Sequence, residues 1–393
     1  MNNIKYFDHA ATTAVNIDVL KEMLPYFNVE YGNPSSIYGL GRRTKRAIEE
    51  TRTKVAKAIN ARPNEIYFTG CGSESDNLAI KGIARSLKRK GNHIITSKIE
   101  HHAILNSCKT LEQEGFRVTY LNVDENGFIN LSELQNAITD KTILISIMTA
   151  NNEIGTIEPI KEIGRIAHEH GVFFHTDAVQ AFGHIQINVD ELNIDMLSAS
   201  GHKFNGPKGV GILYLRESVK IGSFIHGGSQ ERGKRAGTHN TPGIVGFAKA
   251  TELAKLSLNK RTAYESELRD YLINRVLTEI PYTKLNGHKE NRLPNNTNFS
   301  FRFIEGESLL IMLDQKGICG SSGSACTSGS LDPSHVLLAI GLPHEIAHGS
   351  LRLTLSEQNT KEEIDKVVEE LKAIVERLRS MSPLYEDFIK NNA

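Results

Sequence analysis

An alternation of helix and strand patterns between about residues 44 and 250 constrains the fold most strongly. The segment "TKRAIEETRTKVAKAIN" (44–60) has apolar residues at helical spacing, and "EIYFT" (65–69) then has the pattern of a short strand. The alternation continues through "NLAIKGIARSLKRKG", "HIIT", "ILISIMTA", "IKEIGRIAHEHG", "VFFHTDA", "MLSAS" and "GILYL". Continuous apolar strands separated by helices predict an α/β fold whose mostly parallel sheet is covered on both faces.

The pattern changes after about residue 260, where longer helices separate the strands "NTNFSFRF" and "SLRLTLS". We expect a large α/β domain over 15–255 and a smaller α+β domain made of 1–14 and 256–393. Near the end, Thr360 and Glu363 have the spacing of a capping box. An apolar stripe follows at Ile364, Val367, Val368, Leu371, Ile374, Val375 and Leu378, which predicts a helix that serves packing.

The charge balance excludes several classes of partner. The chain has 393 residues, with 46 Lys plus Arg and 46 Asp plus Glu, so no net charge draws it to nucleic acid or to an anionic membrane. The start "MNNIKYFDHAATT" lacks a basic segment followed by an apolar one, and no later run approaches about 18 uninterrupted apolar residues. We therefore expect a cytoplasmic protein.

Cysteine use argues against both a disulfide framework and a zinc site. Cysteines stand at 71, 108, 319 and 326, which are too few for a disulfide-stapled domain and show no C-x-x-C spacing. We predict no resident metal, and we expect at least one cysteine to be a free thiol.

Polar residues follow two of the predicted strands. In "GCGSESDN" (70–77), Gly72 and Ser73 would open a helix, either offering N–H groups and a hydroxyl to a phosphate or forming an ordinary cap. Asp177 ends the apolar run "VFFHTDA", so its carboxylate is expected near the interior and needs a cationic partner. That partner is either a structural arginine or lysine or the protonated ring nitrogen of a cofactor.

A third strand end, in "SASGHKFNGPKGVG" (198–211), adds Ser200, His202 and Lys203. A lysine read alone is most simply a solvated loop charge. Here the carboxyl ends of the strands would bring a hydroxyl, an imidazole and an amine to one edge of the sheet. Phosphate donors, a buried carboxylate and an amine together are the groups that pyridoxal phosphate requires.

The strand ending in Asp177, the "SGHK" segment and "GSSGSACTSGSLDPSHVL" (320–337) together resemble cysteine desulfurases of the NifS/IscS type. The segments "YGNPSS", "IEHHAIL", "NNEIGTIEPI", "GPKGVG" and "RAGTHN" also match, so the resemblance covers essentially the whole chain. It implies a fold-type I pyridoxal phosphate enzyme, usually a homodimer, that takes sulfur from L-cysteine and leaves L-alanine.

The resemblance also implies roles for residues around the cofactor. Lys203 would be the Schiff-base lysine, Asp177 the partner of the pyridine nitrogen, and Gln180 a donor to the ring hydroxyl. Asn152 would contact the same hydroxyl region and the substrate, while His101 would lie against the ring. The phosphate would be held by Gly72, Ser73, Ser200 and His202, together with Thr238 of the other subunit.

Two further residues receive substrate roles from the resemblance. Arg352 would make a bidentate pair with the substrate carboxylate, whereas an isolated arginine on a strand is more often in a surface ion pair. Cys326 lies among glycine and small polar residues in a segment that packs poorly, so it is expected to be the nucleophile rather than a buried structural cysteine. It could also ligate an iron–sulfur cluster transiently.

The implied reaction starts when L-cysteine displaces Lys203, whose amine then takes the α-proton while the protonated ring accepts electrons. The Cys326 thiolate then attacks the substrate sulfur and becomes a persulfide. His101 is a reasonable proton relay, with an expected pKa near neutrality.

The chain departs from the family pattern at two places. The family commonly has S-G-A-T-E where this chain has Gly70-Cys71-Gly72-Ser73-Glu74, and asparagine where His9 stands. Ser73 keeps the hydroxyl, and Cys71 is expected to be a small buried residue. We assign no role to His9, regard His102 as structural, and expect Cys108 and Cys319 to be inert.

Other functions stay open at this point. A selenocysteine lyase would use the same scaffold, although the glycine- and serine-rich segment around Cys326 resembles that of desulfurases for iron–sulfur cluster supply. A cofactor-free sulfur-relay protein is an alternative from another class. The expected acceptor is an iron–sulfur scaffold protein, with a tRNA-thiolating protein as the second candidate.

Overall fold

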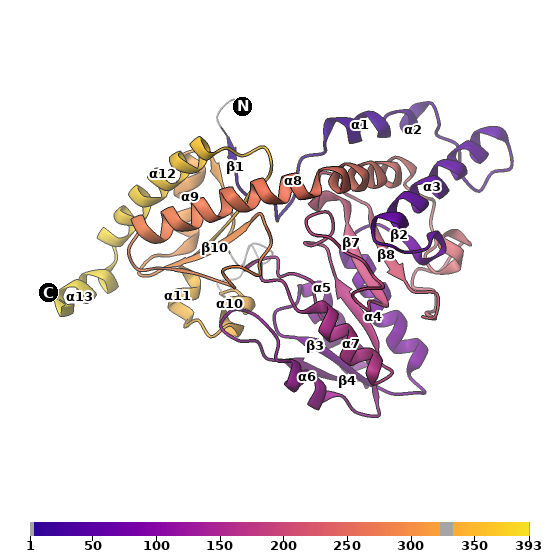
Figure 1. Ribbon diagram of the computed structural model, residues 1–393, viewed down its shortest axis with the longest axis horizontal. Coiled ribbons are helices and arrows are strands. Elements are labelled where there is room, and N and C mark those ends of the chain that lie inside the picture. Colours follow the sequence, from indigo (N-terminus) through magenta and orange to yellow (C-terminus); the bar gives the residue numbers. More distant parts are fainter. Residues whose placement is uncertain (1–3, 323–332, 393) are drawn as a thin grey trace.

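The computed structural model describes residues 4–322 and 333–392. Its central feature is a seven-stranded sheet with the order β2-β8-β7-β6-β5-β3-β4 (Figure 1). The strands are β2 Ile66–Thr69, β3 His93–Ser97, β4 Arg117–Leu121, β5 Thr142–Ser146, β6 Phe173–Asp177, β7 Met196–Ser200 and β8 Gly211–Leu215. The predicted mostly parallel sheet is confirmed, because β3 to β7 are parallel to their neighbours in this group.

Strand β8 runs antiparallel to both β7 and β2. Between β7 and β8 the chain forms only a 3₁₀ turn, η2 (Gly201–Lys203), and a short loop. A parallel return needs a crossover of a dozen or more residues, so this short connection forces the antiparallel direction. The short return also keeps Lys203 directly at the carboxyl end of β7.

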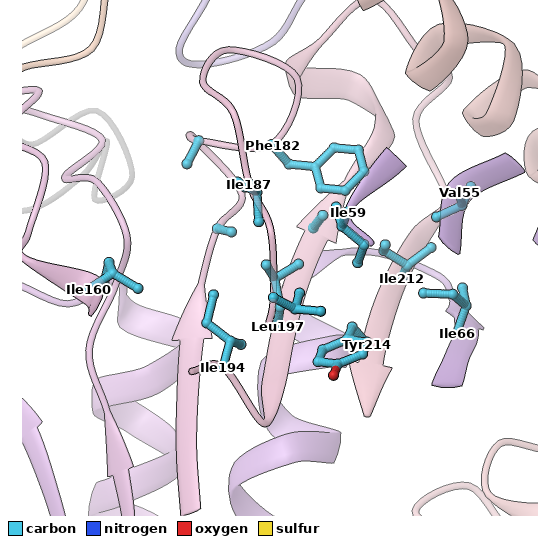
Figure 2. Close-up of a cluster of buried hydrophobic side chains, with 14 of the residues drawn as sticks. Val55, Ile59, Ile66, Ile160, Phe182, Ile187, Ile194, Leu197, Ile212 and Tyr214 are labelled. Carbon is cyan, nitrogen blue, oxygen red and sulfur yellow. The ribbon is translucent and has the colours of Figure 1, made fainter. Parts of the chain in front are cut away.

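Helices cover both faces of the sheet because successive strand residues point to opposite faces. On one face, Ile94, Leu144 and Met196 pack in a core with helices α4 (Gly72–Leu87) and α5 (His102–Gln113). Their sequence neighbours form the core of the other face, which Figure 2 shows in part, with α3 (Gly39–Ala58), α7 (Ile160–Glu169) and the first half of α8 (Thr241–Glu279). Helices α1 (Ile17–Met23), α2 (Pro25–Asn28) and α6 (Leu131–Ala137) complete this part.

A second core lies beside the second half of α8, around an antiparallel sheet with the order β12-β10-β9. Its elements are β9 Thr283–Leu285, β10 Asn296–Phe301, α9 Gly306–Gln315, β12 Ser350–Thr354 and α12 Lys361–Ser380, and α13 Pro383–Asn392 follows α12. Helices α10 (His335–Ala339) and α11 (His344–His348) instead pack with Ile99, Met148 and Ile154 in a smaller core. Strand β1 (Lys5–Tyr6) joins this part by pairing with β11 (Ile318–Cys319). We propose that the two domains, 15–255 and 1–14 with 256–393, follow these two cores, with α8 continuous across them (Figure 1).

Helix α12 is the packing helix that the sequence predicts. Thr360 and Glu363 form the capping box, and the predicted apolar stripe faces the second core, with Leu378 only partly buried. In the part of the chain that the structure describes, no helix is both long enough and apolar enough to span a membrane.

Replacing Leu371 by alanine should destabilise the protein, because its side chain is fully buried in the second core. We expect a loss of about 2–5 kcal/mol in the free energy of unfolding, measured by urea denaturation. The neighbouring exposed Lys372→Ala serves as the control and should change it by less than about 0.5 kcal/mol. Equal effects of the two variants would contradict this packing role.

Candidate active site

The predicted site residues meet in one cavity of about 290 Å³ at the carboxyl ends of the central strands. Asp177 is the last residue of β6 and Ser200 the last of β7, and these strands are neighbours in the sheet. The cavity lining includes Gly72, Ser73, His101, Asn152, Asp177, Gln180, Ser200, His202, Lys203 and Arg352. Of the other predicted site residues, Thr238 is exposed outside this lining, and Cys326 lies outside the described residues.

The carboxylate of Asp177 is buried and accepts a hydrogen bond from the Val179 N–H at 2.8 Å. Burial raises the pKa of Asp177 to about 6, while the Val179 N–H and the nearby Lys203 act in the opposite direction. Asp177 therefore occupies a position where a positive group on the cavity side stabilises its charged form.

Asp76 is a second buried acid in the same cavity, and we did not predict it. Its Oδ1 has no hydrogen-bond partner in the described structure, and His175 Nε2 is 3.8 Å away. Burial and the proximity of Asp177 raise the pKa of Asp76 well above its usual range. The signal was present in the sequence, because Asp76 follows Gly72 by four residues and so lies on the same face of α4.

Lys203 is bound within the cavity and is not a solvated loop charge. Its Nζ donates hydrogen bonds to the backbone carbonyls of Ala10 at 2.6 Å and Ala11 at 2.9 Å. The Gln180 side chain donates to the same Ala10 carbonyl at 3.0 Å. These contacts connect the N-terminal segment to the site. The acceptors are backbone carbonyls, so the identities of Ala10 and Ala11 do not reveal the contacts in the sequence.

Helix α4 begins at Gly72, as predicted, and its first turn opens into the cavity. The N-cap residue Cys71 accepts no side-chain hydrogen bond from this turn. A Cβ atom on Gly72 would lie 2.7 Å from Val179 Cγ2, so only glycine fits here without a shift of Val179.

The prediction that Cys71 is buried is wrong. Cys71 is exposed and lines the cavity, because its extended backbone at the N-cap position keeps the thiol out of the helix and sheet core. By contrast, Cys108 is fully buried, and burial raises the pKa of its thiol to about 12. Burial also raises the pKa of the partly buried Cys319. The thiolate form is therefore disfavoured at both of these positions.

His101 is the N-cap of α5, and its Nδ1 accepts a hydrogen bond from the Ala103 N–H at 3.1 Å. The expectation of a near-neutral pKa for His101 is wrong, because burial lowers this pKa to about 4 and the charges of Lys203 and His102 act in the same direction. A neutral imidazole whose Nδ1 is an acceptor carries its proton on Nε2. His102 instead packs against His335, with ring centroids 4.7 Å apart.

Arg352 on β12 is buried and is not in a surface ion pair. Its guanidinium contacts Asp8 Oδ1 at 3.0 Å and the Asn152 carbonyl at 2.8 Å. Its Nε has no hydrogen-bond partner among the described residues. Arg352 thus lines the cavity and has one buried donor without a partner.

His9, which received no role, is outside the cavity lining. Its ring packs edge-on against Tyr6, with centroids 4.8 Å apart, and burial lowers its pKa to about 4. This environment is that of a neutral packing residue.

The imidazole of His101 should stay neutral between pH 8 and pH 5 in the protein without cofactor, since its pKa is lowered to about 4. Its ¹⁵N chemical shifts, assigned by comparison with His101→Gln, should be those of the neutral ring protonated at Nε2. A titration midpoint near the ordinary pKa of about 6.5 would contradict this account.

The comparisons with known proteins agree with this geometry. The family model "Aminotransferase class-V" matches residues 5–367. The "Cysteine desulfurase IscS" of Clostridium botulinum (strain Hall) is 60% identical over 393 residues, covering 100% of this chain and 99% of the relative.

Two solved structures are similar along nearly the whole chain. A "NifS-like protein" has 40% identity and a TM-score of 0.90, covering 95% of this chain and 100% of that one. "SspA in complex with cysteine" has 40% identity and a TM-score of 0.80, covering 91% and 100%. The chain therefore belongs to the class-V aminotransferase family and, within it, to the cysteine desulfurases, which are pyridoxal phosphate enzymes.

Proposed function

We propose that this protein converts L-cysteine to L-alanine at the described cavity and passes the sulfur to Cys326 as a persulfide. One observation carries the proposal: a single cavity contains the buried carboxylate of Asp177, the amine of Lys203 and the N-terminus of α4. Each of these groups matches a different part of pyridoxal phosphate.

The carboxylate end of the cavity fits the cofactor ring. Asp177 is buried where an added positive charge stabilises its ionised form, and a protonated pyridine nitrogen would supply that charge. Burial and the nearby Asp177 raise the pKa of Asp76, which disfavours a second negative charge there. Gln180 and Asn152 line the same cavity and would contact the ring hydroxyl region.

The part of the cavity beside the first turn of α4 fits a phosphate. The first turn of α4 has backbone N–H groups without a side-chain cap, and the missing Cβ of Gly72 allows close approach. Ser73, Ser200 and His202 line the cavity and would add hydroxyl and imidazole donors.

When bound, the cofactor supplies an electron sink that loosens first the α-proton and then the carbon–sulfur bond of L-cysteine. Lys203 would hold the cofactor and, once the amine of the substrate displaces it, take the α-proton at Nζ. The Ala10 and Ala11 carbonyls, which accept hydrogen bonds from Nζ, would keep the released amine in the cavity.

Arg352 and His101 would orient the substrate. The guanidinium of Arg352, which lines the cavity, can make a bidentate pair with the substrate carboxylate. A neutral His101 with its proton on Nε2 can donate that proton within the cavity.

Cys326 would be the nucleophile toward the substrate sulfur. In that step the carbon–sulfur bond breaks and a sulfur–sulfur bond forms, giving a persulfide on Cys326 and leaving the carbon skeleton to become L-alanine. Described residues on both sides of the Cys326 segment support this role, because Ser321 exchanges two backbone hydrogen bonds with Arg352, at 3.1 and 2.6 Å. On the other side, Ser334 donates to Glu153, which follows Asn152.

We further propose a homodimer in which Thr238 serves the cavity of the partner subunit. Thr238 is exposed and outside the lining of its own cavity. A run of exposed apolar side chains also supports an interface: Ile17, Leu20, Leu24, Phe27, Val29, Tyr31, Ile37 and Tyr38. Single exposed apolar side chains are common on protein surfaces, whereas a run of them within residues 17–38 indicates an interaction surface.

The proposed acceptor of the persulfide sulfur is an iron–sulfur scaffold protein, and the proposed location is the cytoplasm. A reducing compartment keeps a nucleophilic cysteine as a free thiol, which the reaction requires. Recovery of a scaffold protein with the persulfide form in a pull-down, but not with Cys326→Ser, would support this acceptor.

Replacing Lys203 by alanine should lower alanine formation at least ~1,000-fold, because both the covalent anchor and the base for the α-proton are lost. The measurement is alanine release from L-cysteine by cofactor-supplemented protein. Lys208→Ala, an exposed lysine outside the cavity lining, is the matched control and should keep wild-type activity. Normal turnover by Lys203→Ala would contradict the assignment.

Replacing Cys326 by serine should separate substrate binding from sulfur transfer. A serine hydroxyl stays protonated near neutral pH, whereas the cavity residues that bind cysteine are unchanged. The spectral change on adding cysteine should persist, while alanine formation and reductant-removable sulfur on the protein should disappear.

The same assays on Cys71→Ser, Cys108→Ser and Cys319→Ser provide the controls, and each should retain both signals. Mass spectrometry that located the extra sulfur of the wild-type protein on the exposed Cys71 would overturn the choice of Cys326.

A further inference from the structure

The turn η3 (Gln230–Gly233), which precedes Thr238, has an unfavourable backbone conformation. Glu231 has φ 44° and Arg232 has φ 56°, and both are non-glycine residues in the left-handed region. Such conformations persist only where surrounding contacts impose them, and they often occur near functional sites. The contacts of Glu231 show what imposes this one.

The Glu231 carboxylate is bound from three sides in the interior. Arg52 on α3 donates to both of its oxygens, at 2.8 and 2.9 Å, and the Phe68 N–H on β2 donates at 2.8 Å. His239 Nε2 contacts the carboxylate at 2.8 Å. Burial alone would raise the pKa of Glu231, but these partners lower it to about 2. The side chains of Arg52 and Glu231 are only 3% and 1% exposed.

The contact between the Glu231 carboxylate and His239 Nε2 closes the segment 231–239 into a loop. Thr238 lies within this loop, directly before His239. Within the loop, Arg235 contacts Glu74 at 2.8 Å, and Glu74 accepts from the Gly70 N–H at 2.8 Å. Thr238, at the exposed side of this loop, is therefore bracketed by contacts to α3, β2 and the first turn of α4.

We infer that Glu231 is a positioning residue for the active site of the neighbouring subunit, because it closes the loop that presents Thr238. The inference rests on the proposed homodimer and extends it. A purely local role would instead stabilise only the subunit that contains Glu231. The two roles differ in which cavity of a dimer is affected.

The test uses dimers in which only one cavity retains Lys203, made by co-expressing two differently tagged chains. In the first pairing, a Glu231→Gln chain is combined with a Lys203→Ala chain. The only cavity with Lys203 then receives an intact loop from its neighbour. In the second pairing, a chain carrying both Glu231→Gln and Lys203→Ala is combined with a wild-type chain. The only cavity with Lys203 then receives the altered loop.

The readout is the affinity for pyridoxal phosphate, titrated by the visible absorbance that depends on Lys203. The first pairing should bind nearly as tightly as a dimer of wild-type and Lys203→Ala chains. The second should bind about tenfold more weakly, the order expected for one lost hydrogen bond to a charged group. Glu217→Gln, which alters the exposed pair with Arg62, is the matched control and should affect neither pairing.

Equal affinities in the two pairings, or weaker binding in the first, would overturn the inference. A protein that binds cofactor but elutes as a monomer in size-exclusion chromatography would overturn the homodimer and this inference together. Should Glu231→Gln fail to fold, Arg52→Lys in the same pairings keeps the charge but loses the two-point contact, and the same contrast is expected.

Discussion

The buried carboxylate of Asp177 is the constraint on which the rest of the site depends. Burial raises the pKa of Asp177, so a positive group beside this carboxylate stabilises its ionised form. The nearby Asp76 is also buried, and its pKa is raised because two neighbouring carboxylates disfavour each other's negative charge. The sheet topology meets this constraint by ending β6 and β7 side by side, which brings Lys203 to the same cavity. The chemistry of the site therefore follows from the direction of two neighbouring strands.

The small second core has a role in this arrangement beyond its own stability. Arg352 lies on β12 of that part, yet its guanidinium lines the cavity at the end of the large sheet. The N-terminal segment makes the opposite connection, because β1 pairs with β11 while the following Ala10 and Ala11 carbonyls bind Lys203. The cavity thus depends on both packed parts of the chain.

Much of this could be predicted from the sequence, because strand and helix periodicity and the residues at strand ends are local signals. The position of Asp177 at the end of an apolar run and of Lys203 after the next strand led directly to the cavity. The antiparallel direction of β8 was not predicted, although the short connection between β7 and β8 favours it, because a parallel return needs a crossover of about a dozen residues or more.

Features that depend on distant parts of the chain were missed. Cys71 is exposed because the N-cap of α4 borders the cavity. Its small, modestly apolar side chain had indicated burial. The contact between Arg52 and Glu231 joins residues 179 positions apart and has no local signature. Backbone contacts, such as those of Lys203 with Ala10 and Ala11, leave no trace in side-chain identity.

We propose that Lys203 is the residue that holds pyridoxal phosphate in this cavity. Borohydride reduction of the cofactor-loaded protein fixes the cofactor to whichever amine holds it, and peptide mass spectrometry then locates that amine. We predict a pyridoxyl group on Lys203. Recovery of the pyridoxyl group on another lysine, or on no residue at all, would contradict this assignment.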